Sequence, residues 1–216
     1  KVYDIPSNRL SPVGGVILLH GWGANGKDLL PLAESLRLPQ LRFLALEGKV
    51  DVPMTGGKGK GWFMFPPTKS APNEITDSRE QIMDAIDKLI EEGLPEEKIV
   101  LMGFSQGGSM ALNTLVKSRK KLGGIVVMSG FFMEQESLKQ NNSLPLETPI
   151  FAGHGTYDNL VPFHLAKESI LTLNDAGFSV EWYEYPCEHR IVVEELQDIR
   201  LFLGRVFGKD FNVSGV

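Results

Sequence analysis

The chain has 216 residues, of which 42% are hydrophobic and 23% charged, and its formal net charge at pH 7 is −5. This composition suits one large α/β domain with a substantial core, and the acidic balance without a basic stripe argues against nucleic-acid binding. The single cysteine, Cys187, excludes an intrachain disulfide and a cysteine zinc cluster, and no apolar run is long enough for a transmembrane segment. We therefore expect a cytoplasmic protein without a metal site, with earlier removal of a signal peptide left open.

Short, continuous apolar runs recur along the chain. Runs of this kind are typical of strands that are buried on both faces of a largely parallel sheet. The last run is longer and rich in aromatic and β-branched residues. The predicted strands cover residues 16–19, 43–46, 99–102, 125–128, 149–152 and 178–185.

Helical patterns alternate with these strands. The first has apolar residues on one face between 82 and 90, with Asp77 and Ser78 as candidate N-caps and Gly93 as a stop. Alternating strands and helices predict an α/β fold with a mostly parallel central sheet and helices on both faces, in one domain over residues 1–216. The other predicted helices cover residues 106–115, 162–176 and 191–207.

The segment 48–73 is the irregular part of the chain. It is rich in glycine and continues into an aromatic stretch that includes Trp62, Phe63 and Phe65. A loop of this length in a compact domain is often functional, so these aromatic residues are candidates for the wall of an apolar substrate pocket. An extra strand or a flap of the core is an equally supported interpretation, and the two are compatible.

The strongest functional signal is the pentapeptide Gly103-Phe104-Ser105-Gln106-Gly107. It follows a predicted buried strand directly and precedes a predicted helix, the context that gives G-x-S-x-G its meaning. A sharp turn there lifts the serine above the sheet, and the helix N-terminus favours a developing oxyanion. Ser105 is therefore the predicted nucleophile.

A serine hydroxyl needs a base, and the base needs an orienting carboxylate. In folds of this kind the chain order is serine, acid, histidine, which leaves His164 and His189 as bases. His164 lies in the first turn of a predicted helix, whereas His189 follows the last predicted strand, where catalytic groups of open α/β sheets collect. His189 is the predicted base.

The acid is expected to follow the preceding strand in the same way. Asp158 stands a few residues after the run 149–152. Glu184 lies inside a predicted strand, and Glu188 is adjacent to the histidine, so that the chain would have to fold back sharply. Asp158 is the predicted acid, with capping of the following helix as its structural alternative.

An oxyanion needs two N–H donors aimed at the developing charge. The backbone N–H of Gln106 is one candidate, since it directly follows the nucleophile. The turn after the first predicted strand supplies the other, the backbone N–H of Trp22, while His20 is expected to hydrogen-bond within that turn.

Two other motifs are weaker signals of function than the serine pentapeptide. Residues 21–28 approach a phosphate-binding loop, but Asp28 stands where that loop needs a hydroxyl for magnesium, and its carboxylate would repel phosphate. Cys187 stands two residues before His189 and is expected to be a small apolar filler rather than a nucleophile.

With these residues assembled, the chain resembles the carboxylesterase, phospholipase and acyl-protein thioesterase family of small α/β hydrolases. The resemblance rests on Leu19-His20-Gly21-Trp22-Gly23, on Gly103-Phe104-Ser105-Gln106-Gly107-Gly108, and on His154-Gly155-Thr156-Tyr157-Asp158 with Val161-Pro162. It implies an α/β-hydrolase fold, the triad Ser105, Asp158 and His189, and oxyanion donors at Trp22 and Gln106. It also implies hydrolysis of carboxylic esters or thioesters without a cofactor. The family usually has glycine before the catalytic histidine, where this chain has Glu188.

The expected activity is hydrolysis of a small acyl ester or thioester, or of a lysophospholipid or an acylated protein, through an acyl-enzyme. The alternative is a hydrolase-fold binding or receptor protein with little turnover. The apolar residues 131–133 leave two further interpretations open, a homodimer contact or core packing.

Overall fold

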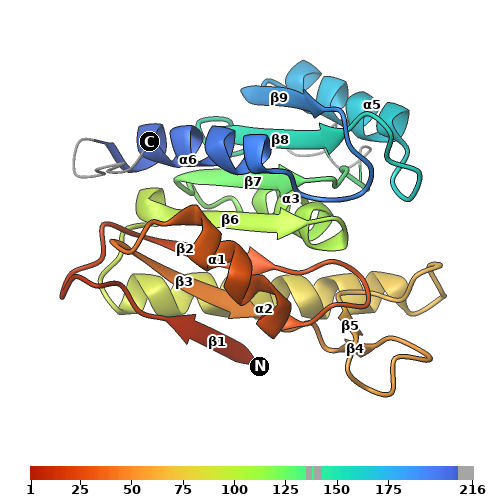
Figure 1. Cartoon of the computed structure of the whole chain (residues 1–216), viewed down its shortest axis with the longest axis horizontal. Helices are drawn as coiled ribbons and strands as arrows, with labels where there is room; N and C mark the ends of the chain where they lie inside the picture. Colours follow the sequence, from red (N-terminus) through yellow and green to blue (C-terminus); the bar gives the residue numbers. More distant parts are fainter. Residues whose placement is uncertain (135–137, 139–142, 209–216) are drawn as a thin grey trace.

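The structure is a computed structural model that describes residues 1–134, 138 and 143–208. The other residues of the predicted domain, 135–137, 139–142 and 209–216, lie outside the described part. A seven-stranded sheet forms the centre, in the order β1-β3-β2-β6-β7-β8-β9, and all neighbours are parallel except β1 and β3 (Figure 1). The strands are β1 (Val2–Ile5), β2 (Gly14–Leu19), β3 (Leu41–Leu46), β6 (Ile99–Phe104), β7 (Gly124–Met128), β8 (Ile150–Gly155) and β9 (Val180–Tyr185).

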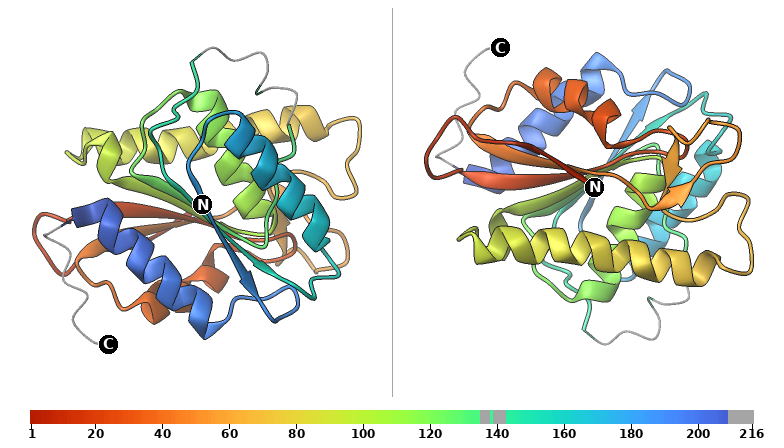
Figure 2. Two further views of the ribbon diagram at one scale, coloured as in Figure 1. Left: turned by 90° about the horizontal axis from the view of Figure 1, so that it is seen from above. Right: turned by 90° about the horizontal axis from the view of Figure 1, so that it is seen from below.

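The helices cover both faces of the sheet, and the two views of Figure 2 show them as separate layers. Helices α2, α3 and α5 pack on one face, and α1 and α6 pack on the other. The helical segments are η1 (Gly26–Leu29), α1 (Leu30–Leu36), α2 (Ala71–Glu91), η2 (Glu96–Lys98), α3 (Gln106–Ser118), α5 (Phe163–Asp175) and α6 (Val193–Phe207). The predicted fold class is therefore confirmed.

Side-chain alternation along β2 shows how the sequence builds two cores. Val16 and Leu18 pack with α1 and α6, whereas Ile17 and Leu19 pack with α2 and α3, and all four are fully buried. Successive side chains of a strand point to opposite faces, so a continuous apolar run is what a doubly covered strand requires.

The predicted start of the first long helix was wrong. Asp77 and Ser78 were the candidate caps, but α2 begins at Ala71, and its first two turns are too polar to show the apolar period. Ser78 instead lies inside the helix and donates a 2.5 Å hydrogen bond to the backbone oxygen of Trp62. The predicted stop is confirmed, because the helix ends at Glu91 and Gly93 has a φ of +98°.

The irregular segment 48–73 contains a short antiparallel hairpin, β4 (Val50–Asp51) with β5 (Lys60–Gly61), before it enters α2. In the segment 131–133, Phe132 is 1% exposed and belongs to the core, which agrees with the core-packing interpretation. No helix within the described residues combines the length and apolar character needed to cross a membrane. The carboxyl ends of β6, β8 and β9 all point to one edge of the sheet, where the predicted catalytic residues follow (Figure 1).

Candidate active site

Ser105 occupies a strained turn between β6 and α3. Its φ is +55° and its ψ is −119°, a backbone conformation that costs a non-glycine residue energy and is concentrated at functional sites. The glycines of the motif permit the turn. A Cβ at Gly107 would lie 2.2 Å from the backbone oxygen of Leu19, and one at Gly103 would lie 2.3 Å from the backbone of Gly107. No side chain fits at either position, so the helix can start directly against the sheet.

The fold brings Ser105, His189 and Asp158 into one hydrogen-bonded row. Nε2 of His189 lies 2.9 Å from Oγ of Ser105, and Nδ1 lies 2.6 Å from Oδ2 of Asp158. A carboxylate only accepts, so Nδ1 carries the proton and leaves Nε2 free to accept the serine hydroxyl. This is the arrangement in which a histidine acts as a general base toward a serine.

The carboxylate of Asp158 is held from several sides. Its side chain has no exposed surface, and Oδ1 accepts backbone N–H groups of Leu160 and Val161, each at 2.9 Å. The loop after β8 therefore folds around its own acid, and the two N–H donors fix Oδ2 toward His189.

His154 is a second histidine at the same carboxylate. Its Nε2 lies 3.4 Å from Oδ2 of Asp158 and 2.9 Å from the backbone oxygen of Val161. It is buried against Trp182 and Phe163, and burial lowers its pKa. A neutral ring at this place supports the acid loop without competing for its charge. The sequence alone did not reveal this role of His154, although the residue stands within the motif His154-Gly155-Thr156-Tyr157-Asp158.

The loop that carries His189 is fixed by packing and by backbone hydrogen bonds. The imidazole lies over the ring of Phe104, with the ring centroids 4.8 Å apart. Tyr157 donates its backbone N–H to the oxygen of Cys187, which ties the base loop to the acid loop. Within residues 186–190, all of them described, none has positive φ, so Glu188 fits where the family usually has glycine.

The turn after β2 lies beside Ser105. A Cβ at Gly21 would lie 3.4 Å from Cβ of Ser105, which places the Trp22 backbone next to the site. His20 is fully buried in this turn, where Nε2 accepts the N–H of Gly48 and Nδ1 contacts the oxygen of Gly21. Burial lowers the pKa of His20, so the ring is a neutral structural element, as the sequence indicated.

Gln106 begins α3, so its backbone N–H lies outside the hydrogen bonds within the helix. Its side chain has a further role that the sequence did not reveal. Oε1 accepts the backbone N–H of Trp62 and Nε2 donates to the oxygen of Phe63, both at 2.8 Å. The Gln106 side chain thus holds the aromatic segment in place.

The three candidate pocket residues lie in different environments. Trp62 has no exposed surface, Phe63 is buried, and both belong to the core that faces α2 and α3. These positions match the core-flap interpretation. Phe65 is 59% exposed and is therefore the one of the three with a ring open to solvent.

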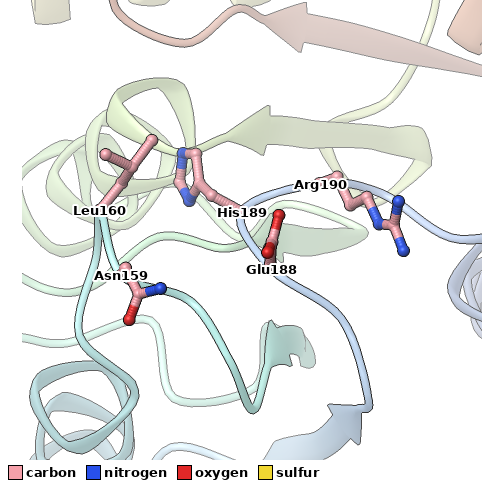
Figure 3. A pocket seen from close by; sticks show the side chains of 5 residues that line it. All are labelled: Asn159, Leu160, Glu188, His189 and Arg190. Carbon is pink, nitrogen blue, oxygen red and sulfur yellow. The ribbon is translucent and has the colours of Figure 1, made fainter.

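A cavity of about 290 Å³ opens beside His189 (Figure 3). The loops after β8 and β9 line it together, and Leu160 and His189 approach each other from these two loops. None of the three candidate pocket residues lines this cavity. Its lining residues are Asn159, Leu160, Glu188, His189 and Arg190.

The rival residues are engaged elsewhere. Glu184 accepts hydrogen bonds from Trp182 and Lys167 on the exposed side of β9. The carboxylate of Asp28 accepts the backbone N–H of Asn25 and forms a capping box at the start of η1. The carboxylate in the segment that resembles a phosphate-binding loop therefore has a structural role. Cys187 is buried, and burial raises the pKa of its thiol, as expected for a filler.

Comparisons with known proteins show the family to which the chain belongs. The phospholipase/carboxylesterase family profile matches residues 3–207. Acyl-protein thioesterase 1 of Neurospora crassa is 34% identical over 210 residues, which cover 87% of this chain and 84% of that protein. Acyl-protein thioesterase 1 of Debaryomyces hansenii is 36% identical over 170 residues, 73% of each chain.

Among solved structures, Arabidopsis thaliana SOBER1 superposes with a TM-score of 0.80 at 26% identity, over 90% of this chain and 99% of that one. The family profile extends across the sheet, the turn with Ser105 and the loops with Asp158 and His189. The chain therefore belongs to the phospholipase/carboxylesterase family of α/β hydrolases and is a hydrolase.

Proposed function

We propose that this protein is a serine hydrolase that cleaves carboxylic esters and thioesters through an acyl-enzyme on Ser105. The observation that carries the proposal is the continuous row from Ser105 through His189 to Asp158, with distances of 2.9 and 2.6 Å. Membership of the family supports the reaction class. The contacts among Ser105, His189 and Asp158 support their roles as nucleophile, base and acid.

Acylation begins when Oγ of Ser105 attacks the ester carbonyl carbon and its proton moves to Nε2 of His189. The tetrahedral oxyanion accepts hydrogen bonds from the backbone N–H groups of Gln106 and Trp22, whose turns both lie at Ser105. The carboxylate of Asp158 stabilises the imidazolium that has formed. The bond to the leaving group then breaks, and the leaving alkoxide or thiolate takes the proton from Nε2.

Deacylation repeats these steps with water. Nε2 of His189 removes a proton from water, the hydroxide attacks the acyl carbon, and Ser105 leaves with the proton that Nε2 returns. The products are a carboxylic acid and the free serine. Each proton transfer in this reaction passes through Nε2 of His189.

We extend the proposal to long-chain acyl thioesters, including an acylated cysteine of a protein. The relatives named acyl-protein thioesterase support this substrate class. The cavity beside His189 is accessible from the surface, since Leu160 in its lining is exposed.

A panel of nitrophenyl esters and acyl-CoA thioesters of increasing chain length tests the function. We expect turnover by the wild type, and we expect Ser105→Ala to lower kcat by about 10⁶-fold. Equal rates for the two proteins would contradict the proposal. Stable binding of intact substrate by the wild type without turnover would identify a binding protein instead.

A further inference from the structure

Glu195 is a buried acid that the proposed reaction does not use. It is the third residue of α6 and is 1% exposed, although glutamate is seldom buried without a partner. Its carboxyl group accepts the backbone N–H of Val192, the residue that caps α6. Its other oxygen, Oε1, has no hydrogen-bond partner among residues 1–134, 138 and 143–208.

The carboxyl group fills a space that Gly153 leaves open in β8. A Cβ at Gly153 would lie 2.4 Å from Oε1 of Glu195 and 3.0 Å from the ring of Tyr185. Gly153 stands five residues before Asp158, and Val192 stands three residues after His189. Glu195 therefore contacts both the strand that leads to the acid and the end of the loop that carries the base.

The surroundings of Glu195 favour its uncharged form. Burial raises its pKa to about 8, and the carboxylate of Asp198 adds to this effect, while the Val192 N–H acts in the opposite direction. The other titratable groups near it are the phenol of Tyr185 on β9 and the thiol of Cys187, and burial raises the pKa of each. Within the described residues, no cation is among the groups that shift the pKa of Glu195, whereas Arg190 lies near the thiol of Cys187 and acts to lower its pKa.

We propose that Glu195 is a positioning residue that, while uncharged, holds the His189 loop against β8, and that its ionisation at alkaline pH loosens this contact. The role rests on the proposed function, because it matters only if His189 and Asp158 form the catalytic pair. A buried carboxylate beside Gly153 attracts water or moves outward, and either response displaces Val192 and the loop before it.

The experiment measures kcat and KM for a nitrophenyl ester between about pH 6 and about pH 10, where the essential groups show in the profile. The Ser105→Ala rate is subtracted as the part of the rate that does not depend on Ser105. The variants are Glu195→Gln, which keeps the size and the acceptor, and Glu195→Ala, which removes them. Glu194→Gln is the matched control on the neighbouring exposed residue.

We expect the wild-type kcat to fall above about pH 8, where Glu195 ionises. Glu195→Gln keeps kcat at neutral pH within about twofold and lacks this alkaline fall, because its side chain does not ionise. Glu195→Ala loses about tenfold or more in kcat at unchanged KM, toward the ~100-fold that a 1 Å displacement of a catalytic group can cost. Glu194→Gln keeps the wild-type profile.

If the kcat of Glu195→Gln still falls at alkaline pH, this role is overturned. It is also overturned if Glu195→Ala folds and its kcat equals that of the wild type. If Glu195→Ala does not fold, the Gln variant decides alone. Labelling of Ser105 by a fluorophosphonate separates the two proposals. A wild type that takes no label overturns the proposed function itself, whereas a labelled wild type with an unaltered Gln profile overturns only the role of Glu195.

Discussion

Gln106 and Trp62 are joined by a 2.8 Å hydrogen bond from the Trp62 backbone N–H to the Gln106 side-chain oxygen. The same side chain donates to Phe63, so one amide group satisfies two backbone groups of a buried segment. The turn that holds Ser105 and the segment before α2 consequently depend on each other for their conformation.

Replacing this amide is expected to destabilise the fold. Gln106→Ala leaves the Trp62 N–H and the Phe63 oxygen buried and unpaired, at a cost of about 2–4 kcal/mol in the free energy of unfolding. Urea unfolding measures the loss. The control is Gln197→Ala on the exposed side of α6, for which we expect a change within about 0.5 kcal/mol. A stability loss no larger than that of the control would contradict the anchoring role.

The charge of Asp158 is expected to be essential for turnover. In Asp158→Asn the amide nitrogen turns toward Nδ1 of His189, because Oδ1 is held by two backbone donors. Nδ1 must then accept, the proton moves to Nε2, and the base is lost, which lowers kcat by about 10⁴-fold. Ester hydrolysis at saturating substrate checks this. The exposed Asp175→Asn serves as the control, and a similarly small effect of both changes would argue against Asp158 as the acid.

The buried His20 predicts a loss of stability in acid. Its pKa is lowered in the folded state, so the unfolded chain binds more protons near its ordinary pKa of about 6.5. The stabilisation is present above that pH and is lost as the pH falls through the folded-state pKa. Urea unfolding at several pH values should show a steeper acid loss for the wild type than for His20→Gln. Equal slopes would rule out a neutral, buried His20.

Glu195 predicts the opposite trend. Its folded-state pKa of about 8 lies above the ordinary 4.5, so its contribution is fully present below 4.5 and is lost as the pH rises toward 8. In this window Glu195→Gln should gain stability over the wild type by up to about 1.4 kcal/mol per pH unit. Thermal and urea unfolding of both proteins across the window measure the gap. A gap that does not change with pH would show that Glu195 is already charged.

The sheet could be predicted because its inner strands are continuous apolar runs, as in residues 16–19 and 99–102. The edge strand β1 was not predicted, since Val2–Ile5 is only half-buried and shows no such run. The start of α2 was missed for a related reason: its first turns face solvent and the Trp62 segment, and carry no apolar period.

The candidate site followed from chain order, because Ser105, Asp158 and His189 each stand just after a strand end. The supporting contacts did not follow from it. The roles of Gln106 and Glu195 depend on partners distant in sequence, such as Trp62 and Gly153, and no local pattern marks such pairs. The interior position of Trp62 was likewise undecidable from the sequence, where an aromatic residue beside glycines fits a pocket and a core equally well.

The central claim is that Ser105 is a nucleophile activated by His189. Labelling with a fluorophosphonate, followed by mass spectrometry of the digested protein, tests it most directly. We expect one adduct, on the peptide that contains Ser105, with none in Ser105→Ala and a strongly reduced labelling rate in His189→Gln. An adduct on another residue, or no adduct on the folded wild type, would contradict the claim.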